Sequence, residues 1–156
     1  MSCISLAESE AKNMKEPLFG TYTPSIDQKG RMSFPNKLRE ILGAEFYLCV
    51  GYENNYIAVY SPEEFNEYCQ KLYSIEGEVG TALRRDLLAG TDKQVPDKQG
   101  RIFLAQHLRD YAGISDNVTV VGALNKAEIW DTERYLAAKN SIDPEAKKAA
   151  LAHMVL

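Results

Sequence analysis

The stretch Asp27-Gln28-Lys29-Gly30-Arg31 occurs a second time in this chain as Asp97-Lys98-Gln99-Gly100-Arg101, which lies 97 − 27 = 70 residues later. The residues that follow repeat as well, since Arg31-Met32-Ser33-Phe34-Pro35 corresponds to Arg101-Ile102-Phe103-Leu104-Ala105. Solenoid proteins repeat at about 20 to 50 residues and need at least three copies. A single duplication at this longer spacing instead predicts two related halves that close on each other.

Each copy of the motif has the residues of a tight turn. Asp stands at the first position and Gly at the fourth, where a left-handed glycine forms the bulge that lets a type I turn join two strands. Apolar and β-branched residues fill 18–26 before the first turn and 31–34 after it, which predicts a β-hairpin. Arg is the first residue after each turn. The structural turn residues are expected to be Asp27, Gly30, Asp97 and Gly100.

The pattern outside the turns predicts the same order of elements in both halves. Apolar residues at helical spacing end at a glycine C-cap in each half, and Ser61 followed by Pro62 is a strong helix start. Helices are predicted at 35–42, 62–73, 79–88 and 105–111, from 131 as the counterpart of 62–73, and from 143 onward. Strands are predicted at 46–50, 56–60, 118–121 and 127–130. Pairing the two copies into an interlocked barrel would remove their exposed sheet edges. We therefore expect an α+β fold with one shared core.

The size of the chain agrees with one shared core. With 156 residues and 45% hydrophobic composition, it is about one domain long, whereas separate halves of about 70 residues would have thin cores. The predicted segments are an extension at 1–16, a first half at 17–78, a second half at 79–140 and a C-terminal helix at 141–156. This last helix is Ala-rich and is a candidate for docking on a neighbouring chain or for fraying.

Composition disfavours several classes of protein. No run of about 18 apolar residues exists, and residues 1–16 lack the features of a signal peptide, so a cytoplasmic protein is expected. Three cysteines without CxxC spacing support neither a disulfide framework nor a metal site. His107 and His153 have no nucleophile and acid at a persuasive spacing. We expect no enzyme activity, no cofactor and no small-molecule substrate.

The distribution of charge is more informative than the net charge of −4. Residues 27–39 contain four basic and one acidic side chain, or +3, and residues 84–109 contain six and three, again +3. Residues 40–78 contain eight acidic side chains and one basic, or −7. Basic charge therefore follows the repeated motif, where it can meet the phosphates of a nucleic acid.

The segments around both turns resemble the MraZ family, which are bacterial transcriptional regulators with a duplicated swapped-hairpin fold like that of AbrB. The resemblance is collinear from about residue 18 to residue 135 and rests on both Asp-x-x-Gly-Arg motifs together with three further segments. These segments are Leu83-Arg84-Arg85-Asp86-Leu87-Leu88-Ala89-Gly90, Leu108-Arg109-Asp110-Tyr111-Ala112-Gly113-Ile114, and Asn125-Lys126 with Glu128-Ile129-Trp130-Asp131. Two departures are visible, since Ala105 stands where the family usually has Pro and about 16 residues precede the matching part.

The resemblance implies a fold, an assembly and a function. The halves should form one intrachain swapped-hairpin β-barrel with flanking helices, and the subunits should form a ring-shaped homo-oligomer. That ring should bind G-rich direct repeats of double-stranded DNA in the promoter of the division and cell-wall gene cluster, which would associate the protein with the nucleoid. The family's DNA-binding positions fall on Asp27 and Arg31, and on Asp97 and Arg101.

The basic residues of the motif each have a second interpretation. Arg31 and Arg101 could pair only with their own Asp, but repetition within basic surroundings and the resemblance favour DNA contact, since a guanidinium can hold a guanine edge or a phosphate with two hydrogen bonds. Lys29 and Lys98 are predicted phosphate contacts, and a solvated surface lysine is a nearly equal alternative. The first copy, which is followed by Pro35, is favoured over the second as the reader of DNA.

Four other arginines can be explained by structural roles. For Arg39 and Arg109, ion pairing with adjacent acidic residues is as good an interpretation as DNA contact. Arg84 and Arg85 are best explained as the polar face of a linker helix.

Two other functions stay open. A ring-forming scaffold could bind proteins through its acidic central face and its terminal helix. An antitoxin-like dimer of the same hairpin fold is disfavoured by the internal duplication, because such proteins usually carry one copy per chain.

Overall fold

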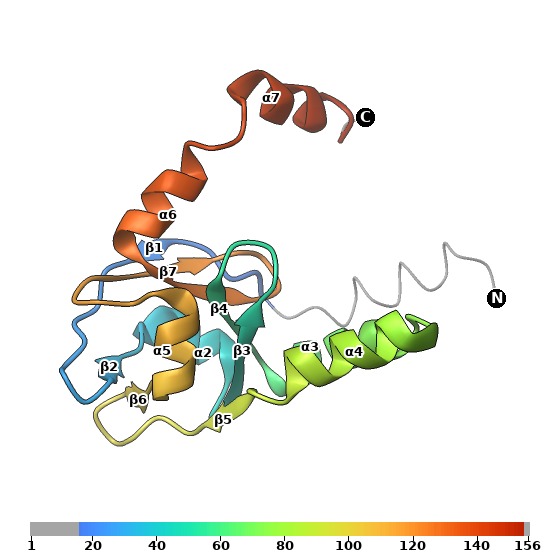
Figure 1. Cartoon of the computed structure of the whole chain (residues 1–156). Coiled ribbons are helices and arrows are strands. Elements are labelled where there is room, and N and C mark those ends of the chain that lie inside the picture. Colours follow the sequence, from blue (N-terminus) through green and yellow to red (C-terminus); the bar gives the residue numbers. More distant parts are fainter. Residues whose placement is uncertain (1–15, 155–156) are drawn as a thin grey trace.

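The fold consists of antiparallel strands flanked by short helices, as Figure 1 shows. The computed structural model describes residues 16–154. The strands are β1 (Thr21–Tyr22), β2 (Arg31–Ser33), β3 (Phe46–Gly51), β4 (Tyr56–Tyr60), β5 (Asp92–Gln94), β6 (Arg101–Phe103), β7 (Val118–Gly122) and β8 (Ala127–Asp131). The helices are α2 (Asn36–Leu42), α3 (Pro62–Tyr73), α4 (Gly77–Leu88), α5 (Gln106–Ala112), α6 (Thr132–Lys139) and α7 (Pro144–Ala152). The expected α+β class is confirmed, and the expected extension lies almost wholly outside the described residues.

Strand pairing interlocks the two halves. Six strands form an antiparallel sheet in the order β1-β7-β8-β4-β3-β5, and β2 and β6 form a separate two-stranded ribbon. Every strand of the first half pairs with a strand of the second, in the pairs β1–β7, β2–β6, β3–β5 and β4–β8. The strands of residues 16–154 thus make two open sheets, and the closed barrel stays a prediction.

The local hairpin predicted between 18–26 and 31–34 forms only at its turn. There the N–H of Asp27 donates to the carbonyl of Arg31 at 2.9 Å, and an isolated bridge joins Ile26 to Met32. Beyond this point β1 pairs with β7 and β2 pairs with β6. The prediction was wrong in this respect because an isolated two-stranded hairpin is marginally stable, whereas each arm gains a larger partner in the other half.

The helices begin and end close to the predicted residues. The α3 helix spans Pro62–Tyr73 as expected, and the Ser61 hydroxyl accepts a hydrogen bond from the N–H of Glu64 at 3.2 Å. The residue before α2 is Pro35, with φ −54° and ψ 126°, and the residue before α5 is Ala105, with φ −59° and ψ 148°. Alanine therefore adopts the backbone conformation that proline fixes, and α5 starts like α2.

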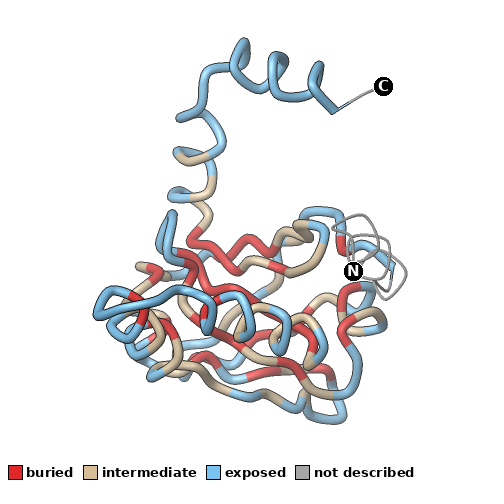
Figure 2. Tube along the Cα trace, turned by 90° about the vertical axis from the view of Figure 1, so that its right-hand side faces the viewer, coloured by how far each residue is buried: buried red, intermediate tan, exposed pale blue. Residues whose placement is uncertain are grey.

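A single core joins the halves. Its buried members come mainly from β2, α2, β3 and β4 and from their counterparts β6, α5, β7 and β8, joined by Leu18, Phe34 and Leu104. Many lie 70 residues apart, namely Met32 and Ile102, Phe34 and Leu104, Leu38 and Leu108, Leu48 and Val118, and Val59 and Ile129. Figure 2 shows these buried segments running through the body of the molecule. The expectation of a shared core is confirmed.

A second apolar cluster covers the other face of the sheet. It combines Tyr56, Tyr60 and Trp130 from the strands with Phe65 and Tyr68 from α3. The Tyr60 and Tyr68 rings stack with centroids 5.1 Å apart. The strand aromatics are thus explained by packing.

The outer helices leave this body. The α3–α4 pair lies at the opposite end of the molecule from the β2–β6 ribbon, and α6 and α7 form an arm that extends away from the sheet (Figure 1). Side chains of α7 are exposed throughout (Figure 2). Within residues 16–154, no helix is long and apolar enough to span a bilayer.

Candidate nucleic-acid interface

Both repeated motifs form the predicted turn, closed by a backbone hydrogen bond and ending in a left-handed glycine. The N–H of Gly30 donates to the carbonyl of Asp27 at 3.1 Å, and the N–H of Gly100 donates to that of Asp97 at 2.9 Å. The φ angles of the two glycines are +94° and +78°, a region that glycine enters without steric cost. This geometry agrees with the turn roles expected of Asp27, Gly30, Asp97 and Gly100, which stay a prediction.

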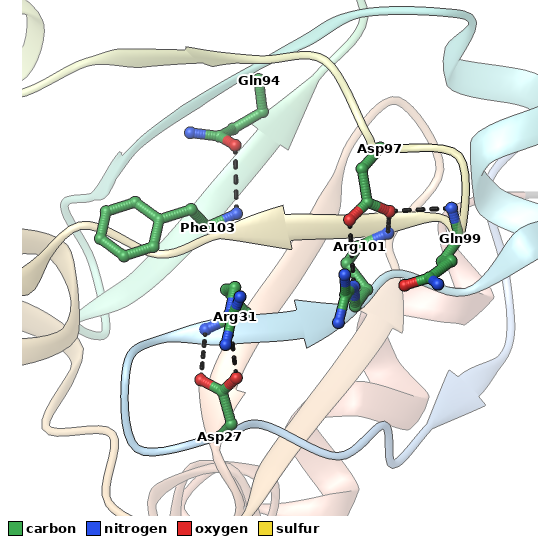
Figure 3. Close-up of polar contacts among 7 residues, drawn as sticks. All are labelled: Asp27, Arg31, Gln94, Asp97, Gln99, Arg101 and Phe103. Atoms are coloured by element: carbon green, nitrogen blue, oxygen red, sulfur yellow. Dashed lines mark hydrogen bonds and ion pairs between the residues drawn. The ribbon is translucent and has the colours of Figure 1, made fainter.

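Each motif aspartate fixes its turn and its arginine at once. One carboxylate oxygen of Asp27 accepts from the N–H groups of Lys29 and Arg31, both at 2.9 Å, and the other accepts from Arg31 Nε at 3.0 Å. Asp97 makes the same three contacts, again at 2.9, 2.9 and 3.0 Å (Figure 3). The backbone N–H and guanidinium of Arg31 hold the pKa of Asp27 below its ordinary value, and those of Arg101 do the same for Asp97.

The arginines retain unused hydrogen-bonding capacity. Both Asp contacts engage only Nε, so the terminal Nη groups of Arg31 and Arg101 have no hydrogen-bond partner among residues 16–154. The two side chains are 46% and 40% exposed. A guanidinium held at Nε presents its Nη edge, which can donate two parallel hydrogen bonds to a guanine edge or a phosphate.

The β2–β6 ribbon brings the two motifs onto one surface. Arg31 lies opposite Phe103, Met32 opposite Ile102, and Ser33 opposite Arg101. Met32 and Ile102 are buried, so the outer two pairs share the exposed face. We call the residues Arg31, Ser33, Arg101 and Phe103 the ribbon face.

Backbone bonds between the halves frame the ribbon face. The N–H of Leu104 donates to the carbonyl of Gly30 at 2.8 Å, and the N–H of Phe34 donates to that of Gly100 at 3.0 Å. Because hydrogen-bonded and non-hydrogen-bonded pairs alternate in an antiparallel ladder, Arg31 and Phe103 form a non-hydrogen-bonded pair, whose side chains lie closer together.

Two arginines that the sequence left open support the turns. Arg109 Nε donates to the carbonyl of Leu104 at 3.0 Å, and its guanidinium lies where a Cβ on Gly30 would come within 2.9 Å of Nε. Arg39 covers Gly100 in the same way and donates to the carbonyl of Phe34 at 3.3 Å. Each half thus supplies the arginine that packs on the other half's turn. Ion pairing with adjacent acidic residues, the alternative considered from the sequence, is absent for both in the described part of the chain.

The turn lysines and Arg84, which the sequence also singled out, lie in different parts of the molecule. Lys29 and Lys98 are exposed at the tips of the turns, but they occupy different places, since Lys29 corresponds to Gln99 and Lys98 to Gln28. Arg84 Nη1 instead donates to the carbonyls of Leu72 and Ile75 at 3.1 and 2.9 Å, which caps the end of α3 far from the ribbon. The structural interpretation of Arg84 is therefore confirmed.

The surroundings offer little other chemistry. Among residues 16–154, no group of three or more His, Cys, Asp or Glu side chains could hold a metal ion. His107 Nε2 lies 2.9 Å from the carbonyl of Gly90, a packing contact between α5 and the end of α4. Burial raises the pKa of the Cys49 thiol to about 12, which makes it a poor nucleophile at neutral pH.

Comparison with known proteins decides the family. A family model described as "MraZ protein, putative antitoxin-like" matches the chain twice, over residues 18–85 and 87–155. The chain belongs to the MraZ family. Each of the two MraZ matches contains one Asp-x-x-Gly-Arg turn, so the ribbon is built from one strand of each match.

Individual MraZ relatives resemble the chain over most of its length. A protein of Saccharopolyspora erythraea named Transcriptional regulator MraZ is 40% identical over 118 residues, which cover 74% of this chain and 82% of the relative. Proteins of the same name from Rhodococcus jostii and Micrococcus luteus are each 38% identical, over 87% and 85% of this chain and 98% and 95% of the relatives.

The sequence predicted both arginines as DNA contacts, which stays a prediction, but ranked them unequally. The structure gives both motifs the same hydrogen bonds and nearly the same exposure, so no local feature of the turns favours the first copy. The sequence did not identify Phe103 as part of the site. The available signal was its place two residues after Arg101, which puts both side chains on one face of a strand.

Proposed function

We propose that this chain is a transcriptional regulator that binds double-stranded DNA through the ribbon face. The observation that carries the proposal is the pair of arginines, Arg31 and Arg101, each fixed at Nε and half-exposed on one two-stranded ribbon. A two-stranded ribbon fits the major groove of B-DNA, and Arg is the commonest side chain to contact guanine there. Lys29 and Lys98 would meet the phosphates on either side.

One subunit would bind DNA weakly on its own. The chain has a net charge of −4 and presents few cations, while non-specific affinity depends on the number of phosphates neutralised. We therefore propose a ring of subunits, in which the halves at 17–78 and 79–140 form a swapped-hairpin barrel. Linked ribbons would bind successive repeats at high effective concentration, and a head-to-tail ring suits direct repeats better than palindromes.

The MraZ resemblance supplies the proposed target. We propose that the ring binds G-rich direct repeats upstream of a division and cell-wall gene cluster, as part of the nucleoid. Guanine-rich sites agree with the donor-only chemistry of arginine, because guanine presents two acceptors in the major groove.

Replacing Arg31 by alanine tests this assignment. Specific binding to the DNA upstream of this gene should weaken by at least ~1 kcal/mol, the lower end for a bidentate base contact. Titration followed by fluorescence anisotropy measures the change, and R101A should give a similar loss. R85A is the matched control, because it removes the same charge from α4. The assignment is wrong if folded R31A binds like the unchanged chain.

A second candidate is a protein-binding scaffold, which the exposed α7 arm favours. Leu151 in α7 and Met154 just after it are 61% and 76% exposed. Salt dependence separates the two functions, since DNA binding through cations weakens steeply with added salt. A scaffold would bind no promoter DNA even at low salt.

A further inference from the structure

The ribbon face is nearly twofold symmetric. Rotation about an axis through the Met32–Ile102 pair exchanges Arg31 with Arg101, and both arginines make the same 3.0 Å bond to their aspartate. A symmetric reader binds a site equally well in two opposite directions. A direct repeat has one direction, so a ribbon that reads it needs a difference between its two ends.

The ribbon face carries one such difference. The rotation exchanges Ser33 with Phe103, and these are the only unlike residues on the face. Phe103 is 46% exposed, although burial of an aromatic side chain is favourable. It lies directly opposite Arg31 in the closer type of cross-strand pair. One end of the face is thus apolar beside its arginine, and the other end is polar.

The backbone of Phe103 is also held by a contact without a counterpart in the first half. Its N–H donates to Gln94 Oε1 at 3.1 Å (Figure 3), and Gln94 Nε2 donates to Asp92 at 2.7 Å. The position equivalent to Gln94 is Pro24, since 94 − 70 = 24. A proline side chain has no hydrogen-bond acceptor, so the outer edge of β2 lacks this support at Ser33.

We propose that Phe103 sets the direction in which the ribbon lies on DNA, by packing against the methyl group of a thymine next to the guanine that Arg31 contacts. This inference rests on the proposed function. Phe is one of the side chains that contact the thymine methyl in the major groove, and serine can hydrogen-bond to any base edge. In the reversed orientation, Ser33 would face the methyl group and Phe103 a polar edge.

The direction of binding can be read by photocrosslinking. A photoreactive amino acid replaces Gln28, which is exposed at the tip of the first turn, and the probe is a duplex that the unchanged chain selects from a random-sequence pool. Crosslinks should fall on one flank of each repeat for the unchanged ribbon. F103S and S33F make the two ends alike and should give crosslinks on both flanks, and the double exchange S33F/F103S should move them to the opposite flank.

The turn lysines provide the control, because they also differ between the halves. K29Q/K98Q makes both turns Asp-Gln-Gln-Gly-Arg apart from the photoreactive residue at position 28, and crosslinks on one flank are still expected. Crosslinks on both flanks in this control, or an unchanged single flank in F103S, would overturn the role of Phe103. If R31A/R101A loses DNA binding and F103S retains it, the proposed function stands whatever the crosslinks of F103S show. If the unchanged chain selects no duplex, the proposed function and the role of Phe103 are both overturned.

Uracil in place of thymine tests the contact itself. Removing the 5-methyl group from the selected duplex should weaken binding of the unchanged chain about fourfold, which corresponds to one buried methyl group. F103S should bind the thymine and uracil duplexes equally. An equal loss in both proteins would assign the methyl contact to another residue and overturn the proposal.

Discussion

At the scale of single residues, the candidate site depends on one carboxylate per turn. Asp27 accepts two backbone N–H groups and one guanidinium N–H within 3.0 Å, so the same side chain shapes the turn and orients Arg31. This arrangement leaves the arginine's outer edge available while restricting its motion. Restricting a long side chain before binding reduces the entropy lost on binding.

The stabilising effect of these aspartates should depend on pH. The pKa values of Asp27 and Asp97 are lowered in the folded chain from the ordinary value of 3.8, so their ionised forms favour folding. That contribution is fully present above pH 3.8 and is lost as the pH falls through the lower pKa of the folded state. At neutral pH, D27N/D97N should therefore unfold at a lower temperature than the unchanged chain. This difference in unfolding temperature should shrink in acid. A difference that stays constant into strong acid would contradict this.

Gly30 should tolerate no side chain. Its φ of +94° strains any other residue, and an added Cβ would lie 2.7 Å from the carbonyl oxygen of Leu104 and 2.9 Å from Arg109 Nε. We expect G30A to lower the free energy of unfolding by about 3 kcal/mol. Gly77 is the matched control, because its φ is +79° and nothing lies within 4 Å of an added Cβ. G77A should cost about 1 kcal/mol, and equal losses in urea denaturation would show that backbone strain alone accounts for G30A.

At the scale of elements, the sequence predicted most of the strands and helices and the interlocking of the halves, but not which strand of one half pairs with which strand of the other. The alternation of Met32 between exposed neighbours identifies β2 and its buried face. The same alternation occurs around Ile102, so pairing within a half and pairing between halves satisfy the pattern equally. Only the contacts of the whole folded chain favour pairing between the halves.

The supporting arginines illustrate the same limit. Arg39 packs on Gly100 and Arg109 packs on Gly30, at separations of 100 − 39 = 61 and 109 − 30 = 79 residues. Sequence reasoning compares near neighbours, which are Glu40 for the first and Asp110 for the second. The motif aspartates contact Arg31 and Arg101, which lie only four residues away, so a near-neighbour comparison can suggest these contacts.

At the scale of the whole molecule, the duplication makes the chain a dimer of halves within one polypeptide. Four strand pairs each join a strand of the first half to a strand of the second. The core contains equivalent side chains from both halves. The ribbon face exists only where both halves meet, since Arg31 and Arg101 come from different halves.

A single half should therefore not persist as a folded monomer. Residues 16–88 alone would expose the buried sides of Met32, Phe34 and Leu48, would leave β1 and β2 without partners, and would leave β4 paired with β3 only. A fragment of this size cannot meet that cost with its own core. We expect each separate half, 16–88 or 89–154, to be unfolded or to pair with a second copy of itself, because the halves are similar. Mixing the two should restore the far-UV circular dichroism of the intact chain in a one-to-one complex seen by analytical ultracentrifugation. A folded, monomeric half in the same experiments would mean that the halves are independent domains, and that the ribbon forms by docking of two finished units.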